Sequence, residues 1–149
     1  MKIEALSKED QLTLCRAAER LCGARLRSLR SYADPQDKPL LKILDERLED
    51  WRTQLRALER LDRGTPGALR EEDAAGFLRE RFPSLRNGFG EGFVTREVAL
   101  YLAECVEDER SRFYHDMAAA ARDAEARVVF QQLAARDEAH LKFLRTVLL

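Results

Sequence analysis

Asp137 and His140 lie three positions apart in the last long helical segment of the chain. Residues at that spacing share one face of a helix. The same face carries apolar residues at alternating spacings of three and four, which is typical of a helix in a bundle core: Ala126, Phe130, Leu133, Leu144 and Val147. Burying a carboxylate and an imidazole there without partners would cost on the order of several kcal/mol. A bound metal ion is the first candidate for the compensating partner.

Carboxylates interrupt the apolar faces of two other predicted helices in the same way. Glu19 lies in the stripe of the first helix, and Glu104 and Glu107 lie in the stripe of the third. At similar depth in a bundle, these groups would form one cluster with Asp137 and His140. Carboxylate oxygens with one imidazole suit iron, manganese or zinc. Glu104, one turn before Glu107, is either an additional ligand or a partly exposed residue at the rim.

An interpretation of this cluster without a metal also stays open. His140 would then be hydrogen-bonded to a carboxylate with an arginine nearby, as a remnant polar core. Cys15 and Cys22 flank Glu19 on its own face. Their thiolates could bind zinc or copper, but buried free cysteines more often pack as small apolar side chains.

The elements that must position these residues are four long helices and one short helix. The pattern predicts helices over about residues 7–32, 36–63, 69–81, 95–121 and 123–149, and no competing strand. Short links after the first and third long helices, and a longer one between the second and third, predict two helical hairpins joined by a crossover. The glycine-containing segment 87–92 is predicted to be a loop. No strand precedes it, which argues against a phosphate-binding role.

Composition excludes several classes of function. The 149 residues fit one domain, 1–149, with 36% charged and 45% hydrophobic residues and a net charge of -1. The balanced charge argues against binding nucleic acid, and no apolar run approaches the ~20 residues of a membrane span. The N-terminal residues lack the apolar stretch of a signal peptide, so we expect a cytoplasmic protein with reduced cysteines.

The C-terminal third of the chain resembles a known family. The order of Glu107, Phe113-Tyr114, Phe130-Gln131-Gln132-Leu133-Ala134 and Asp137-x-x-His140 is similar to the rubrerythrin branch of the ferritin-like superfamily. The similarity covers residues 95–149, and the first two helices look like the other half of a duplicated hairpin. The resemblance implies an all-α, ferritin-like four-helix bundle.

The same resemblance implies a set of metal ligands. In the family, one Glu from each of two helices and a Glu-x-x-His from each of the other two hold two iron ions. Glu19 and Glu107 match the single glutamates. Asp137 and His140 match one Glu-x-x-His, with Asp, one methylene shorter, replacing Glu. Tyr114 matches the aromatic residue beside the metal.

The second helix lacks the other Glu-x-x-His. Its apolar stripe is predicted to be uninterrupted, and it consists of Leu41, Leu44, Leu48, Trp51, Leu55 and Leu58. Leu48 and Trp51 occupy the two ligand positions. Glu49 lies one residue away and points about 100° aside, so whether it substitutes is left open. Half of a dinuclear site is therefore missing.

Two functions remain in competition. The first is a rubrerythrin-like iron-binding protein that handles peroxide, oxygen or iron stress with an incomplete centre, with manganese or zinc as other candidate metals. As an enzyme it would be a non-haem iron oxidoreductase or peroxidase, and it would need an external electron donor because the chain has no Cys-x-x-Cys. The alternative is a metal-free bundle acting as a structural or protein-interaction module. In both cases we expect a homodimer.

Overall fold

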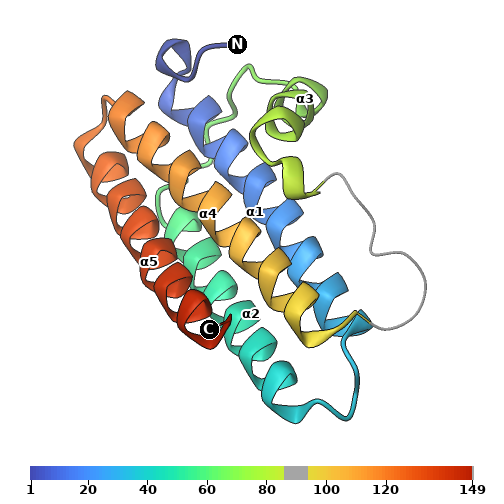
Figure 1. The fold of residues 1–149 in the computed structure, drawn as a ribbon. Coiled ribbons are helices and arrows are strands. Elements are labelled where there is room, and N and C mark those ends of the chain that lie inside the picture. The colour runs from blue at the N-terminus through green and yellow to red at the C-terminus, as the bar shows by residue number, and fades with distance from the viewer. Residues whose placement is uncertain (86–93, 149) are drawn as a thin grey trace.

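The chain is all-helical in the residues that the structure, a computed structural model, describes: 1–85 and 94–148. Figure 1 shows the arrangement. Within those ranges there are five α-helices, two short 3-10 helices and no strand. The α-helices are α1 (Lys8–Tyr32), α2 (Lys38–Glu59), α3 (Glu71–Arg81), α4 (Arg96–Ala120) and α5 (Ala124–Leu148), and the 3-10 helices are η1 (Ile3–Ala5) and η2 (Pro83–Leu85). The predicted all-α class is confirmed. The predicted loop 87–92 lies outside the described residues.

Side-chain caps fix where the long helices begin. The hydroxyl oxygens of Ser7 and Thr95 accept hydrogen bonds from backbone N–H groups three residues ahead, at 3.1 and 3.3 Å. The carboxylates of Asp37 and Asp123 do the same at 3.2 and 2.9 Å. Each cap satisfies an N–H that has no partner inside the helix. The predicted starts are therefore confirmed to within two residues.

The second helix ends four residues earlier than predicted. Leu61 N–H donates to the Leu58 carbonyl at 3.0 Å, and Asp62 N–H donates to the Glu59 carbonyl at 3.1 Å, which tightens the last turn. Gly64 then takes a φ of 77°, a conformation that a side chain disfavours. The chain turns there towards α3, which packs against α1.

The four long helices form two hairpins, α1–α2 and α4–α5, as Figure 1 shows. At one end, Val94 N–H donates to the Tyr32 carbonyl at 2.9 Å, which places the start of α4 beside the α1–α2 turn. At the other end, Lys8 pairs with Asp123 at 3.3 Å, which places the α4–α5 turn beside the start of α1. Helix α4 therefore runs antiparallel to α1 and parallel to α2. None of the helices in the described residues combines the length and hydropathy needed to cross a membrane.

Two apolar clusters fill the bundle. One contains the aromatic residues Phe82, Phe113, Tyr114 and Phe130. The other contains Trp51 and leucines of all four long helices. Between them, charged and amide side chains are buried at mid-helix: Glu19, Gln54, Glu107, Arg110 and Asp137. We call these five residues the polar layer.

Candidate metal centre

The polar layer brings together three of the four predicted principal ligands, and the fourth lies at its edge. Glu19 comes from α1, Glu107 from α4 and Asp137 from α5, and all three are at most 1% exposed. His140, one turn after Asp137, has a side chain that is 12% exposed and contacts Glu107. The sequence thus identified the three carboxylates that are buried in this layer.

Arg110 lies at the centre of the layer, and sequence reasoning missed it. Its Nη2 donates to both carboxylate oxygens of Glu19 at 3.0 Å, and also to the amide oxygen of Gln54. Its Nη1 lies 3.9 Å from Glu107 Oε2, and its Nε lies 3.9 Å from Asp137 Oδ2. Burial alone would lower the pKa of Arg110, but the three carboxylates outweigh it and raise this pKa well above its ordinary value. A permanent positive charge is therefore built into the core.

Glu19 is fully engaged by this arginine and by its other neighbours. Besides the two hydrogen bonds from Arg110, its carboxylate accepts one from the Tyr114 hydroxyl. Trp51 covers the same turn of α1, with its indole N–H donating to the Glu19 carbonyl at 2.8 Å. Gly23 lies directly beneath the Trp51 ring. Glu19 thus lies in the layer, with its carboxylate hydrogen-bonded to Arg110 and Tyr114.

Helix α2 contributes polar side chains that the sequence pattern did not predict. Gln54 is completely buried and donates to Asp137 Oδ1 at 3.0 Å. Asp50 Oδ2 lies 3.1 Å from His140 Nε2 and 3.1 Å from Arg47 Nη2. The prediction of a wholly apolar second stripe was wrong, because Arg47 and Gln54 are buried beside Leu48 and Trp51. Positions 47, 50 and 54 are spaced by three and four, so a second, polar stripe was present in the sequence.

Six buried side-chain atoms in and beside the layer have no hydrogen-bond partner. Three are arginine nitrogens, namely Arg110 Nε and the Nε and Nη1 of Arg47. The other three belong to possible metal ligands: Glu107 Oε2, Asp137 Oδ2 and His140 Nδ1. The ligand atoms of these residues lie within 4.8 Å of one another, and among the described residues they form the one group of this kind. We call Glu107, Asp137 and His140 the acceptor trio. A carboxylate can only accept, so the contact with Asp50 requires a proton on His140 Nε2. The other ring nitrogen, Nδ1, lies 3.7 Å from Glu107 Oε2.

The two carboxylates of the trio have different proton affinities. Burial raises the pKa of Asp137 well above its ordinary value, and the charges of Glu107 and Glu19 add to this against the opposing charge of Arg110. Burial also acts to raise the pKa of Glu107, but contacts with His140 and Arg110 outweigh it and leave this pKa lowered. Without a metal, Asp137 therefore binds a proton more readily than Glu107 does.

Two other acidic candidates lie outside the layer. Glu104 accepts a hydrogen bond from Arg145 at 2.9 Å near the surface. Glu49 is exposed and pairs with Arg52 and Arg56 at 3.3 and 3.9 Å, so it does not replace the missing ligand of the second helix. The thiols of Cys15 and Cys22 are buried, and burial raises the pKa of both well above the usual range. Both cysteines therefore stay protonated.

No protein-family model, curated protein or solved structure matches this chain. The resemblance to rubrerythrins stays a prediction, and the fit of a metal rests on the side chains themselves. They fit one divalent ion, because the acceptor trio offers three free ligand atoms and Asp50 fixes the histidine tautomer. They do not fit a dinuclear centre, because Arg110 holds Glu19, and α2 supplies Leu48, Trp51 and Gln54 in place of ligands.

Proposed function

We propose that this protein is a ferritin-like, rubrerythrin-related bundle that binds one divalent transition-metal ion through Glu107, Asp137 and His140. The observation that carries the proposal is the convergence of Glu107 Oε2, Asp137 Oδ2 and His140 Nδ1, three buried atoms that can ligate a metal and have no hydrogen-bond partner. Buried acceptors without partners are rare and costly. Protons can relieve the repulsion in part, whereas a cation would satisfy all three atoms at once.

The neighbours of His140 support this role. Histidines that bind a metal through one ring nitrogen usually donate the other N–H to a carboxylate, which orients the ring and fixes its tautomer. Asp50 stands in this position at 3.1 Å, and Arg47 holds Asp50 in turn. Asp50 is also more exposed than His140, with side-chain exposures of 31% and 12%. An ion would therefore reach the trio from the α2–α5 side.

The donor set suits iron, manganese or zinc. Three protein ligands leave coordination positions for water or a small oxygen ligand, so bound iron would supply redox chemistry towards peroxide or oxygen. The protein would then act in peroxide, oxygen or iron-stress handling with an external electron donor. The pairing of α1 with α2 and of α4 with α5, across a long connection, supports the ferritin-like assignment.

The two histidines of the chain provide the test. His140→Ala removes a proposed ligand. His115→Ala removes an exposed histidine that pairs with Glu138 on the same hairpin, which makes it the matched control. Protein purified without chelators or a histidine tag is loaded with Fe(II) under anaerobic conditions, or with Mn(II) or Zn(II), and its metal content is measured by elemental mass spectrometry.

We expect one ion per chain in the wild type and in His115→Ala, and none in His140→Ala. A hundredfold excess of metal over its dissociation constant should also stabilise the wild type by about 2.7 kcal/mol. Equal metal content in the two histidine variants would refute the assignment.

A metal-free structural or interaction module is the second candidate. The ion pair between Arg110 and Glu19, with a proton on Asp137, favours it, because these groups neutralise much of the layer without a metal. Such a protein would act through its surface, as a homodimer. It predicts that the melting temperature of the wild type does not respond to Fe(II), Mn(II) or Zn(II).

A further inference from the structure

We propose that Arg110 restricts the centre to a single ion, because its guanidinium group occupies the place of a second cation between Glu19 and the acceptor trio. This inference rests on the proposed function, since it assigns the number of ions that the trio and its surroundings can hold. It makes Arg110 a determinant of metal stoichiometry and not a ligand.

The contacts of the guanidinium support this role. Its nitrogens face oxygen atoms of four residues on all four long helices: Glu19, Gln54, Glu107 and Asp137. The contacts to Glu19 are full hydrogen bonds at 3.0 Å, whereas those to Glu107 and Asp137 are looser, at 3.9 Å. The arginine thus binds the α1 carboxylate firmly and leaves Glu107 Oε2 and Asp137 Oδ2 without a hydrogen bond.

Charge balance leads to the same number of ions. With Asp137 ionised, the buried carboxylates of Glu19, Glu107 and Asp137 carry three negative charges. One guanidinium and one divalent cation neutralise them. A second divalent cation beside Arg110 would leave two uncompensated positive charges in a buried layer, where unpaired charge is strongly unfavourable.

Removing the guanidinium would leave a second group of oxygen ligands around the vacated volume. Both oxygens of Glu19 and the amide oxygen of Gln54 would lose their donor. The Tyr114 hydroxyl already lies against Glu19. Together with the inner faces of Glu107 and Asp137, these atoms come from four helices and form an oxygen-rich set that suits a divalent cation.

The experiment measures the number of Zn(II) or Mn(II) ions per chain by elemental mass spectrometry after equilibrium dialysis. The variants are Arg110→Ala, Arg110→Lys and the double variant Arg110→Ala with Glu19→Gln. We expect one ion in the wild type and two in Arg110→Ala. Arg110→Lys keeps the charge and should bind one. The double variant removes the proposed α1 ligand of the second ion and should return to one.

Because Arg110→Ala leaves buried carboxylates unpaired, its folding is followed by circular dichroism with and without the metal. Folding only in the presence of metal, with two ions bound, supports the proposal. A folded Arg110→Ala with one ion or none overturns it, and so does an Arg110→Ala that stays unfolded in excess metal.

The outcomes separate the two proposals. One ion in both the wild type and Arg110→Ala would refute the role of Arg110 and leave the proposed function intact. No ion in the wild type and one in Arg110→Ala would refute the proposed function. It would also refute the single-ion limit, because the guanidinium would then prevent all metal binding.

Discussion

The two hairpins of this bundle contribute different chemistry to the same layer. Helices α4 and α5 supply the acceptor trio, whose three ligand atoms lack partners. Helices α1 and α2 supply groups that are already paired: Glu19 with Arg110, Gln54 with Asp137 and Asp50 with His140. One half of the layer therefore carries the unpartnered ligand atoms, and the other half carries side chains that contact them. The difference shows that α2, with Leu48 and Trp51 at the predicted ligand positions, still contacts the trio through Asp50 and Gln54.

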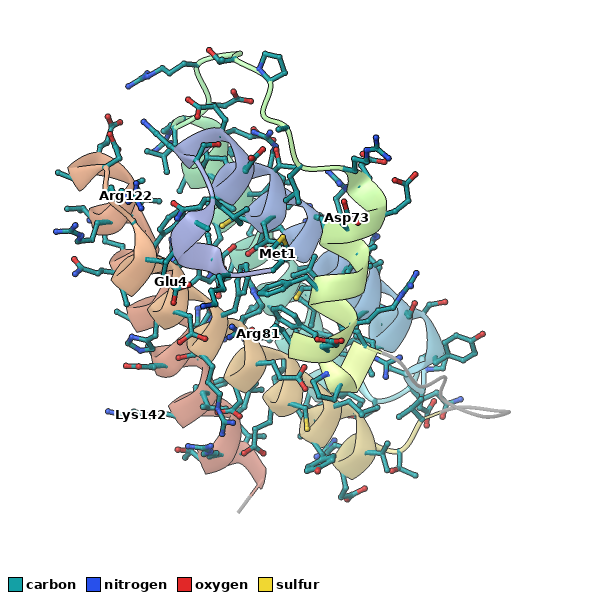
Figure 2. All side chains as sticks on the ribbon, turned by 90° about the horizontal axis from the view of Figure 1, so that it is seen from above. Met1, Glu4, Asp73, Arg81, Arg122 and Lys142 are labelled. Carbon is teal, nitrogen blue, oxygen red and sulfur yellow. The ribbon has the colours of Figure 1, made fainter. Side chains whose placement is uncertain are left out.

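A surface groove lies apart from the polar layer, and Figure 2 labels four of the residues that line it. Seen from above, Met1, Glu4 and Arg81 lie over one end of the bundle, with Arg122 nearby. These residues line a groove of about 780 Å³ that contains no member of the acceptor trio. The candidate centre is instead covered by packed side chains, which suits an ion and leaves little room for a larger ligand.

The largest effect should come from removing the charge that links the two halves. Arg110→Ala leaves Glu19 and its neighbours buried without their cation, and breaking a buried pair in this way costs about 3–5 kcal/mol. Denaturant unfolding with a chelator present measures the loss. Arg112→Ala, which removes an exposed partner of Asp108 on the same helix, is the control and should change little. A loss no greater than that of the control would mean that the two halves are not coupled through Arg110.

A second prediction tests whether Asp50 on α2 orients His140 of the trio. Asp50→Asn keeps the size of the side chain but weakens the orientation of His140, and such changes cost about 10- to 100-fold in metal affinity. Isothermal titration with Zn(II) measures it. Asp45→Asn, an exposed position on α2 that pairs with Arg30, is the matched control. Equal affinities in the two variants would show that Asp50 does not position the ligand.

A third prediction separates the packing of the α1–α2 hairpin from metal binding by the trio. A Cβ at position 23 would overlap the Trp51 ring, so Gly23→Ala should destabilise the protein by about 1–3 kcal/mol through overpacking. Gly76→Ala meets open space in α3 and should not destabilise. The number of ions bound should stay unchanged in both variants, because α4 and α5 hold the trio. A changed number of ions in Gly23→Ala would assign the α1–α2 hairpin a direct role in binding.

The smallest effect should be the change of stability with pH in the metal-free protein. One proton changes the free energy of unfolding by at most about 1.4 kcal/mol per pH unit. The pKa of Asp137 is raised in the folded state, so above about pH 4 the unfolded chain has lost a proton that the folded chain keeps. Stability should therefore fall as pH rises from that point until Asp137 ionises. The lowered pKa of Glu107 acts in the opposite direction, but only in the acid range where the unfolded glutamate still titrates.

Asp137→Asn should remove this downward slope. Denaturant unfolding of both proteins in chelator between pH 4 and pH 8 measures the difference. Parallel stability curves would show that Asp137 does not carry the proton.

Much of the fold could be predicted from the sequence because its signals are local. The caps at Ser7, Thr95 and Asp123 are satisfied within one turn, and the spacing of apolar residues reports which face of each helix is buried. The same spacing identified Glu19, Glu107 and Asp137 as buried, since a carboxylate in an apolar stripe is recognisable without knowing its partners.

Only the tertiary structure decided what those carboxylates face. Arg110 lies three residues after Glu107, at the margin of the α4 stripe, where an arginine usually reaches solvent. Its burial depends on Glu19 and Gln54, which are 91 and 56 residues away in the chain. The partners of His140 and Asp137 on α2, Asp50 and Gln54, are 90 and 83 residues away. Periodicity determines which side chains enter a core, but the pairing of their charges depends on how helices from different parts of the chain are packed together.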